Sequence, residues 1–414
     1  MKFGEHVIVV QNGDKVIAAN KENGQWIRLS KEVYQILSQI VAENLDINMC
    51  ESFFEEPTDF SFIKGLYLFL EKAQIICPDD WCLKTYNKIV SIQLTNKCNL
   101  RCKHCCVDAG ESIDMNVELS TNEIKEIFDK VIRWKPRNIM LSGGEPMYRK
   151  DFKELLEYLR NNYNGKIVLS TNALLINENN IRWLGEWCDA FEISIDGVDE
   201  DTCSAVRGKG VFSKVCESVK LIKKYTEKPI NMSMVFSDKN DYLVPKFKEL
   251  NKKMGTEAIC RAFVPRGRGE ANKALFSSKA DDDVYINSEY LCNEYKKPFG
   301  ITTCAAGVRE LFIRCDGLIQ PCPSYMEKEY SLGNILKIDN ISELIENNSI
   351  AFSNQVLEDS TKPLEECKDC KVRLFCWTCP GESLDIKTKE ALKKRCDIMK
   401  PILMKRVWED EILM

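Results

Sequence analysis

Residues 90–106 read VSIQLTNKCNLRCKHCC, an apolar segment that leads directly into a loop with closely spaced cysteines. The spacing is Cys98-x3-Cys102-x2-Cys105. Three thiolates on one short loop can bind three irons of a 4Fe-4S cubane and leave the fourth iron without a protein ligand. An iron left open in this way is a catalytic feature.

The surroundings of this loop indicate an α/β architecture. Strands and helices alternate from about residue 86 to about residue 300, which predicts a parallel sheet with crossover helices. Six such units are too few for an eight-fold barrel, so we expect a partial (β/α)6 TIM-type barrel with its chemistry at the carboxyl ends of the strands. The expected strands are residues 90–95, 137–142, 166–171, 190–195, 231–236 and 258–263, and the expected helices lie near 121–134, 150–161, 181–187, 212–225 and 242–253.

Polar residues follow the next three expected strands. Two glycines after the second strand would let the backbone approach a ligand closely. Because parallel strands end at one edge of a sheet, these residues and the cysteine loop would converge on one site, although each group alone also fits an ordinary turn. They are Gly143, Gly144, Glu145 and Pro146 after the second strand, Ser170, Thr171 and Asn172 at the third, and Ser194, Asp196 and Gly197 at the fourth.

Residues 1–85 predict a small α+β region of winged-helix type. HVIVVQ and KVIAAN flank the turn at residues 12–14, a strong hairpin signal, and WIRLS supplies a third strand. Two helices follow, with Ser30 as the expected cap of the first and Thr58 or Asp59 as the expected cap of the second. Pro78, Asp79 and Asp80 indicate a linker to the α/β region.

Eight cysteines lie between residues 301 and 414, and seven of them form a spaced pattern that leads us to expect a region organised by metal rather than by a large core. The seven are Cys304, Cys322, Cys367, Cys370, Cys376, Cys379 and Cys396. Seven thiols suffice for one four-ligand and one three-ligand site. The alternative is zinc, but CxxC pairs that close on one zinc ion usually stand roughly 15 to 20 residues apart. Only five residues separate Cys370 from Cys376.

Composition narrows the functional classes further. The chain has 414 residues and 20 cysteines, and a reducing cytosol would not support a disulfide framework of that size. A formal net charge of -5 gives no general basic field, so we expect no nucleic-acid partner. No signal peptide and no long uninterrupted apolar run is present, so we expect a cytoplasmic protein without a membrane partner.

Taken together, the motifs resemble the radical S-adenosylmethionine (SAM) superfamily over residues 86–300. The resemblance implies that the cysteine loop holds a 4Fe-4S cluster that cleaves SAM to a 5'-deoxyadenosyl radical. It implies that His104 packs on the adenine and that residues 143–146 meet the methionine amino group. Ser194 and Arg207 would contact the ribose or the carboxylate. The other implied SAM-lining positions are Ser170, Asn172, Asp196 and the loop of residues 265–269, which includes Pro265 and Gly267.

The C-terminal cysteines resemble the SPASM domain over about residues 301–400, except that Cys376 and Cys379 are spaced x2 where x3 is usual. The resemblance implies two auxiliary 4Fe-4S clusters, hence three clusters in all. One would be held by Cys304, Cys322 and Cys379, and the other by Cys367, Cys370, Cys376 and Cys396. The first would have either an open iron or Cys315 as an eighth thiolate, although Cys315 also fits a turn. Cys50, Cys188, Cys216 and Cys260 are interpreted as small core residues.

The N-terminal region resembles the PqqD-like recognition element of enzymes that modify ribosomally synthesised peptides (RiPPs). Such an element captures the leader of a precursor peptide by strand addition. A structural or dimerisation domain is the alternative interpretation.

These resemblances imply a radical SAM peptide maturase of the sactipeptide or ranthipeptide type, which installs thioether crosslinks between a cysteine sulfur and a carbon of its precursor peptide. A flavodoxin- or ferredoxin-type protein would supply electrons. The alternatives are carbon-carbon crosslinking, epimerisation, formylglycine formation as in anaerobic sulfatase maturation, and a non-enzymatic iron-sulfur or zinc redox sensor. Sulfatase-maturating enzymes carry an aspartate after the second SPASM cysteine, whereas Pro323 follows Cys322 here.

Overall fold

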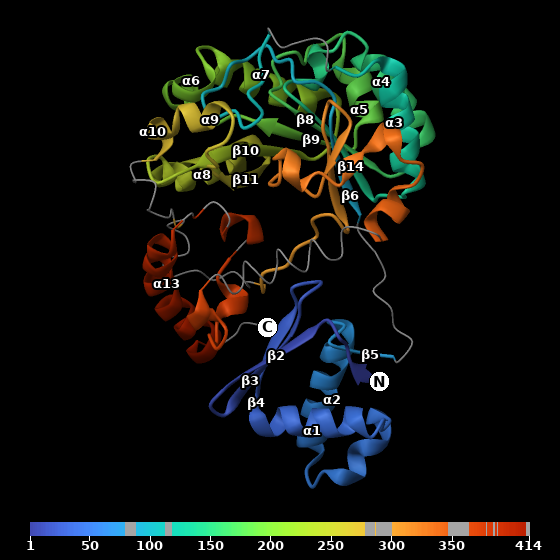
Figure 1. Ribbon diagram of the computed structural model, residues 1–414, viewed down its shortest axis with the longest axis vertical. Coiled ribbons are helices and arrows are strands. Elements are labelled where there is room, and N and C mark those ends of the chain that lie inside the picture. Colours follow the sequence, from blue (N-terminus) through green and yellow to red (C-terminus); the bar gives the residue numbers. More distant parts are fainter. Residues whose placement is uncertain are drawn as a thin grey trace.

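Figure 1 shows the computed structural model of the chain, in which residues 1–78, 88–111, 118–277, 286, 300–346, 364–377, 379–383, 386 and 388–410 are described. The predicted linker residues Asp79 and Asp80 and the predicted boundary at residues 85 and 86 fall outside these ranges. Within them, the chain forms a nine-stranded, a three-stranded and a two-stranded sheet.

The nine-stranded sheet confirms the predicted α/β class. Six of its strands run in the order β11-β10-β9-β8-β7-β6, each parallel to its neighbour. The carboxyl ends of parallel strands lie at the same edge of a sheet, so the loops after β6 to β9 lie close together. All six predicted strands are therefore present, as β6 (Ile89–Gln93), β7 (Asn138–Ser142), β8 (Lys166–Thr171), β9 (Ala190–Ser194), β10 (Ile230–Phe236) and β11 (Glu257–Ala262).

Helices connect these strands and share one core with them. Side chains such as Phe128, Leu156 and Val215 pack on the sheet and are fully buried. The five predicted helices are confirmed as α3 (Thr121–Arg133), α4 (Phe152–Asn162), α5 (Ile181–Trp187), α7 (Val211–Tyr225) and α8 (Val244–Met254). Helices α6 (Glu200–Arg207), α9 (Arg268–Ala271) and α10 (Lys273–Phe276) were not predicted. Helix α6 buries only Cys203 and so shows no apolar periodicity.

The C-terminal region extends the same sheet. Strand β12 (Glu310–Ile313) pairs parallel to β6, and β13 (Leu318–Gln320) and β14 (Gly333–Asn334) continue the sheet in antiparallel fashion. Leu311, Ile313 and Ile319 belong to the core of the α/β region. The expectation that this region is organised by metal rather than by a large core is therefore wrong for these strands. The sheet crosses the predicted boundary at residue 300.

The N-terminal region confirms an α+β arrangement, while its winged-helix type stays a prediction. Strands β2 (Val7–Asn12), β3 (Lys15–Asn20) and β4 (Trp26–Ser30) form an antiparallel sheet, followed by α1 (Lys31–Ala42), a 3-10 helix (Ile47–Phe53) and α2 (Pro57–Lys72). Strand β1 (Lys2–Phe3) pairs with β5 (Ile76–Cys77). Ser30 caps α1 as predicted. The predicted cap of α2 is wrong, because Pro57 starts that helix from Glu56.

Both faces of the N-terminal sheet are covered. Ala18 faces the core formed with α1 and α2, whereas Ile17 and Ala19 face a second core that includes Phe375 and Val407 of the C-terminal region. At its border, Lys15 Nζ donates to the carbonyl of Trp408 at 2.7 Å, and Arg28 donates to that of Val407 at 2.7 Å. The N-terminal sheet therefore lies against the end of the chain that follows α13 (Lys389–Met404) (Figure 1).

Candidate active site

The cysteine loop leaves the carboxyl end of β6 and turns its thiols inward. Cys98 and Cys102 are buried and Cys105 is half-buried. Backbone N–H groups donate to two of the sulfurs, from Leu100 to Cys98 at 3.4 Å and from Ala109 to Cys105 at 3.3 Å. Burial raises the pKa of Cys98 to about 11. Thiols buried in this way lose their protons when a metal coordinates them, so the donor set fits an iron-sulfur cluster.

Gly143 and Gly144 pack against the backbone of the cysteine loop. The N–H of Gly144 donates to the carbonyl of Thr95 at 2.7 Å, and the next N–H donates to that of Lys97 at 2.8 Å. A Cβ atom on Gly144 would lie 2.2 Å from the Lys97 carbonyl oxygen, and one on Gly143 would lie 2.6 Å from that of Thr95. The described contacts of both glycines are thus with the loop that carries the thiols.

We expect Gly144→Ala to lower the free energy of unfolding by about 1 to 3 kcal/mol, because the added methyl group meets backbone that is itself hydrogen-bonded. The displaced loop should also lose iron. Chemical denaturation and iron analysis of anaerobically purified protein measure both effects. Gly65→Ala is the control, since nothing lies within 4 Å of a Cβ there and α2 should gain slightly. Equal losses in both variants would contradict this account of Gly144.

Glu145 ties three segments of the site together. Its carboxylate, fully buried, accepts hydrogen bonds from Thr171 Oγ1 at 2.8 Å, from the N–H of Asn172 at 2.8 Å and from that of Met147 at 3.2 Å. Burial raises the pKa of Glu145 to about 7, although these hydrogen bonds oppose the rise. Asn172 Nδ2 in turn donates to Asn99 Oδ1 at 2.8 Å and lies 3.7 Å from Cys98 Sγ.

The raised pKa of Glu145 predicts a pH dependence of stability. The folded protein holds this proton between about pH 4.5 and pH 7, where the unfolded chain has released it. The free energy of unfolding should therefore fall as pH rises through this window, by at most about 1.4 kcal/mol per pH unit. Anaerobic chemical denaturation at several pH values measures the slope. A cation beside Glu145, such as an ammonium group of a ligand, should flatten it, and a slope of the opposite sign would contradict the assignment.

Asp196 forms a buried charge cluster behind the cysteines. Its Oδ2 lies 2.5 Å from His104 Nε2 and 2.5 Å from a terminal nitrogen of Arg207, and its Oδ1 accepts from the N–H of Val235 at 2.7 Å. Burial would raise the pKa of Asp196, but Arg207 and His104 hold it well below its usual range. Arg207 also lies 3.7 Å from Cys102 Sγ. The cluster therefore places a positive charge beside one of the thiols.

The remaining predicted residues lie around this cluster at the same edge of the sheet. Ser170 and Ser194 are half-buried at the carboxyl ends of β8 and β9, and Pro146 is buried after β7. Pro265 is half-buried in the loop after β11. Gly267, with φ +54°, packs so closely on the cysteine loop that a Cβ would lie 2.5 Å from the Cys106 carbonyl oxygen.

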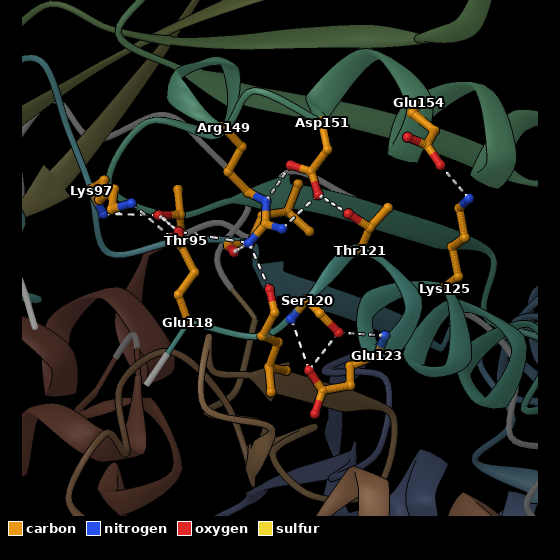
Figure 2. A network of polar contacts seen from close by, with 12 residues as sticks. Thr95, Lys97, Glu118, Ser120, Thr121, Glu123, Lys125, Arg149, Asp151 and Glu154 are labelled. Atoms are coloured by element: carbon orange, nitrogen blue, oxygen red, sulfur yellow. Dashed lines mark hydrogen bonds and ion pairs between the residues drawn. The ribbon is translucent and has the colours of Figure 1, made fainter. Parts of the chain in front are cut away.

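Two positioning residues, Arg149 and Glu118, were not predicted, and Arg268 adds backbone contacts from within the predicted loop at residues 265–269. Arg268 donates from Nε to the carbonyl of Cys102 at 2.8 Å and from a terminal nitrogen to that of Ala109 at 2.7 Å. Figure 2 shows Arg149 and Glu118 next to Thr95 and Lys97, where Glu118 pairs with Lys97 at 3.0 Å. Arg149 donates to the carbonyls of Leu94 and Leu119 at 3.0 and 3.1 Å. Arg268 and Arg149 each donate to two backbone carbonyls that only the folded chain brings within reach, so no side-chain motif marks these contacts.

The structure brings Cys304, Cys322 and Cys379 together around Tyr325. Burial raises the pKa of Cys322 to about 12, and the other two thiols contribute to the rise. All three thiols also raise the pKa of the Tyr325 phenol, after burial. A Cβ on Gly381 would lie 3.5 Å from Cys379 Sγ and 3.7 Å from the Tyr325 hydroxyl.

The other four C-terminal cysteines gather in a second group. Burial raises the pKa of Cys376 to about 12, and Cys370, Cys396 and Cys367 contribute to the rise. Arg395 donates to the Cys376 carbonyl at 2.5 Å and lies over the Trp377 ring at 3.7 Å. In the part of the chain that the structure describes, no three His, Cys, Asp or Glu side chains are grouped tightly enough to hold a single metal ion.

Cys315 belongs to neither group. It follows β12, and its N–H donates to Gln93 Oε1 at the end of β6 at 3.4 Å. Burial raises the pKa of Cys315 to about 11, and the charges that modify it are those of Asp316, Arg314 and Glu118. Of the thiols interpreted as core residues, Cys50 and Cys188 are fully buried, and Cys216 and Cys260 are half-buried.

Comparisons with known proteins identify the family. The family models for the radical SAM superfamily and for SPASM, an iron-sulfur cluster-binding domain, match residues 92–244 and 304–371. The mycofactocin maturase MftC of Mycobacterium ulcerans is 32% identical over 262 residues, which cover 59% of this chain and 70% of MftC. The chain belongs to the radical SAM superfamily. It is an enzyme, and SAM and 4Fe-4S clusters are its cofactors.

Two further similarities agree with this family. The subtilosin biosynthesis protein AlbA of Bacillus subtilis is 24% identical over 258 residues, which cover 59% of this radical SAM enzyme and 56% of AlbA. The structure of Streptococcus suis SuiB bound to SAM shares the fold, with a TM-score of 0.52 and 14% identity over 94% of this chain and 98% of SuiB. None of the described helices is both long enough and apolar enough to span a membrane.

Proposed function

We propose that this radical SAM enzyme matures a ribosomally made precursor peptide by installing thioether crosslinks. The observation that carries the proposal is the division of the C-terminal cysteines into a group of three and a group of four. A cluster with three cysteine ligands leaves one iron to which a peptide thiolate can bind. Relatives named for mycofactocin maturation and subtilosin biosynthesis support a peptide substrate.

The proposed cofactor sites follow the geometry described above. The loop cysteines 98, 102 and 105 would hold the cluster that binds SAM, and the two C-terminal groups would hold one auxiliary cluster each. When bound, the first cluster and SAM supply a 5'-deoxyadenosyl radical, which removes a hydrogen atom from an unactivated carbon. SAM would be held by His104, Gly143, Gly144, Glu145, Pro146, Ser170, Asn172, Ser194, Asp196, Arg207, Pro265 and Gly267.

In this proposal the enzyme's own residues bind SAM and the peptide, orient them for reaction and exclude water. Arg207, the cation beside Cys102, would meet the carboxylate of the SAM methionine, and the carboxylate of Glu145 would meet its ammonium group. Each thioether breaks one C–H and one S–H bond and forms one C–S bond. One hydrogen leaves as 5'-deoxyadenosine, the thiol proton goes to solvent, and the surplus electron goes to an auxiliary cluster. A flavodoxin- or ferredoxin-type protein would supply the electron that starts each cycle.

The three predicted regions take separate roles in the proposal. Residues 1–85 recognise the leader peptide, residues 86–300 form the radical SAM barrel, and residues 301–414 hold the auxiliary clusters. Strands β2 and β4 are the outer strands of the N-terminal sheet, and both faces of that sheet are already covered. A leader peptide would therefore add to an edge of this sheet.

Mass spectrometry of a precursor peptide after anaerobic incubation tests the function. The precursor is sought as a short cysteine-rich reading frame beside the gene. Thioether formation predicts a loss of two hydrogens per crosslink and protection of the cysteine from alkylation. A two-hydrogen loss with free cysteine thiols would indicate a carbon-carbon crosslink, and an unchanged mass with inverted residues would indicate epimerisation. Either result would overturn the thioether proposal.

A further inference from the structure

Glu310 is held next to the group of three cysteines by a tight turn. Its N–H donates to the carbonyl of Ala305 at 2.9 Å, directly after Cys304. The N–H of Gly307 donates to the carbonyls of Glu310 and Pro321, each at 2.9 Å, directly before Cys322. Gly307 has φ +72°, a conformation that favours glycine. One short turn thus brings Glu310 alongside the backbone next to two of the three thiols.

The carboxylate of Glu310 lacks a compensating group. Burial raises the pKa of Glu310, and neither a hydrogen bond nor a cation among the described residues lowers it. Its charge contributes to the raised pKa of Cys322, which places the carboxylate within electrostatic reach of that thiol. Glu310 is half-buried. Partial burial of a carboxylate without a cation or hydrogen bonds is unfavourable, so a positive partner at this position would be stabilising.

Gln320 supplies a second uncompensated group on the same face of the sheet. It pairs with Phe312 across β12 and β13, and Glu310 lies two residues before Phe312 on the same strand. Paired residues and residues two apart share a face, so the Gln320 amide and the Glu310 carboxylate point to the same side. Gln320 is 0% exposed, and both polar atoms of its amide lack a hydrogen-bond partner among the described residues. Buried amides without a partner are rare.

We infer that the Glu310 carboxylate is the fourth protein ligand of the cluster held by Cys304, Cys322 and Cys379, and that the Gln320 amide donates a hydrogen bond to this assembly. An iron of the cluster is the cation that the half-buried carboxylate lacks. Cys315 does not compete for this role, because it lies beside Gln93 at the end of β6. The first auxiliary cluster of the peptide-free enzyme therefore has no open iron.

The inference concerns the resting enzyme and stands whether or not the thioether proposal holds. A carboxylate is a harder ligand than a thiolate and is the weaker of the two on the iron of a sulfide cluster. If a peptide thiolate binds this iron, it displaces Glu310. The carboxylate then keeps small exogenous ligands from the iron until the substrate arrives.

Electron-nuclear double resonance on the reduced protein tests the ligand directly. The full chain carrying alanine at positions 98, 102 and 105 is prepared with glutamate labelled by 13C at the side-chain carboxyl carbon, so that the SAM-binding cluster does not contribute. We expect a 13C coupling on an auxiliary-cluster signal. The coupling should disappear in Glu310→Gln and persist in Glu343→Gln, a matched change at an exposed glutamate of the same region.

Two outcomes would overturn the inference: no coupling in the parent protein, or a coupling that survives in Glu310→Gln. Glu310→Cys guards against a folding defect, since a thiolate can replace the carboxylate on iron. It should lose the coupling, keep the iron content of the parent and shift the reduction potential of the cluster downward. A parent-like potential in that variant would also count against ligation. Peptide modification by the wild-type enzyme is assayed separately, so failure of the proposed function is distinguishable from failure of this inference.

Discussion

Replacing Cys98, Cys102 and Cys105 together with alanine is expected to abolish SAM cleavage. The loop presents two buried thiols and one half-buried thiol, two of the three accept hydrogen bonds from backbone N–H groups, and the variant removes all three. Reductant-dependent formation of 5'-deoxyadenosine should fall to the level of a protein-free control. The iron content should drop by about four per chain, while the C-terminal groups keep their iron. Product analysis by chromatography and iron assay after anaerobic reconstitution measure both quantities.

Cys106→Ala is the matched control, because Cys106 adjoins Cys105 in the same loop but lies outside the spacing of the three ligands. This variant should retain both its iron and its SAM cleavage. Continued consumption of SAM by the triple variant would contradict the site. If Cys106→Ala lost as much iron and SAM cleavage as the triple variant, the effect would not be specific to the three predicted ligands.

Asp196→Asn should produce the largest effect of a single substitution in the radical SAM region. The change leaves the buried Arg207 guanidinium without its counter-charge, and breaking a buried ion pair in this way costs about 3 to 5 kcal/mol. The change also weakens the hydrogen bonds that hold Arg207 and His104 at the proposed SAM site. Loss of a hydrogen bond to a charged group costs about 1.5 to 3 kcal/mol, so kcat/KM for SAM should fall about 10- to 100-fold. Because the pKa of Asp196 lies well below its usual range, wild-type activity should not decline through protonation of this carboxylate at mildly acidic pH.

Denaturation curves and the SAM dependence of 5'-deoxyadenosine formation measure these two losses for Asp196→Asn. Asp199→Asn is the control three residues away. Asp199 caps α6, and asparagine caps helices about as well as aspartate, so neither stability nor kcat/KM should change appreciably. Wild-type stability in Asp196→Asn would show that the charge cluster does not hold the site together.

The elements that follow local rules were predictable from the sequence. Strands β6 to β11 are short, mainly apolar segments that alternate with helical segments, and Ser30 is a suitable cap directly before an amphipathic helix. Strand β12 was not predictable, because its four residues ELFI carry neither alternation nor length, and only the distant pairing with β6 makes them a strand.

The candidate site also has a part that the sequence predicts and a part that only the structure reveals. The motif residues after β6 to β9 meet at one edge because parallel strands must end there. The loop that carries Arg268 was predicted, but the contacts of Arg268 could not be, since its partners are carbonyl groups that only the folded cysteine loop presents. Spacing alone also left the role of Cys315 open, and its position next to Gln93 became visible only once β12 was placed beside β6.

The covered faces of the N-terminal sheet have a practical consequence for dissecting the enzyme. Removing that region would expose Phe375, Val407 and their neighbours to water, since Ile17 and Ala19 pack against them. A truncated enzyme would therefore aggregate or lose its adjacent cysteine-rich fold for reasons unrelated to peptide capture. Single substitutions along the outer edges of β2 or β4 are a better test of what this region binds.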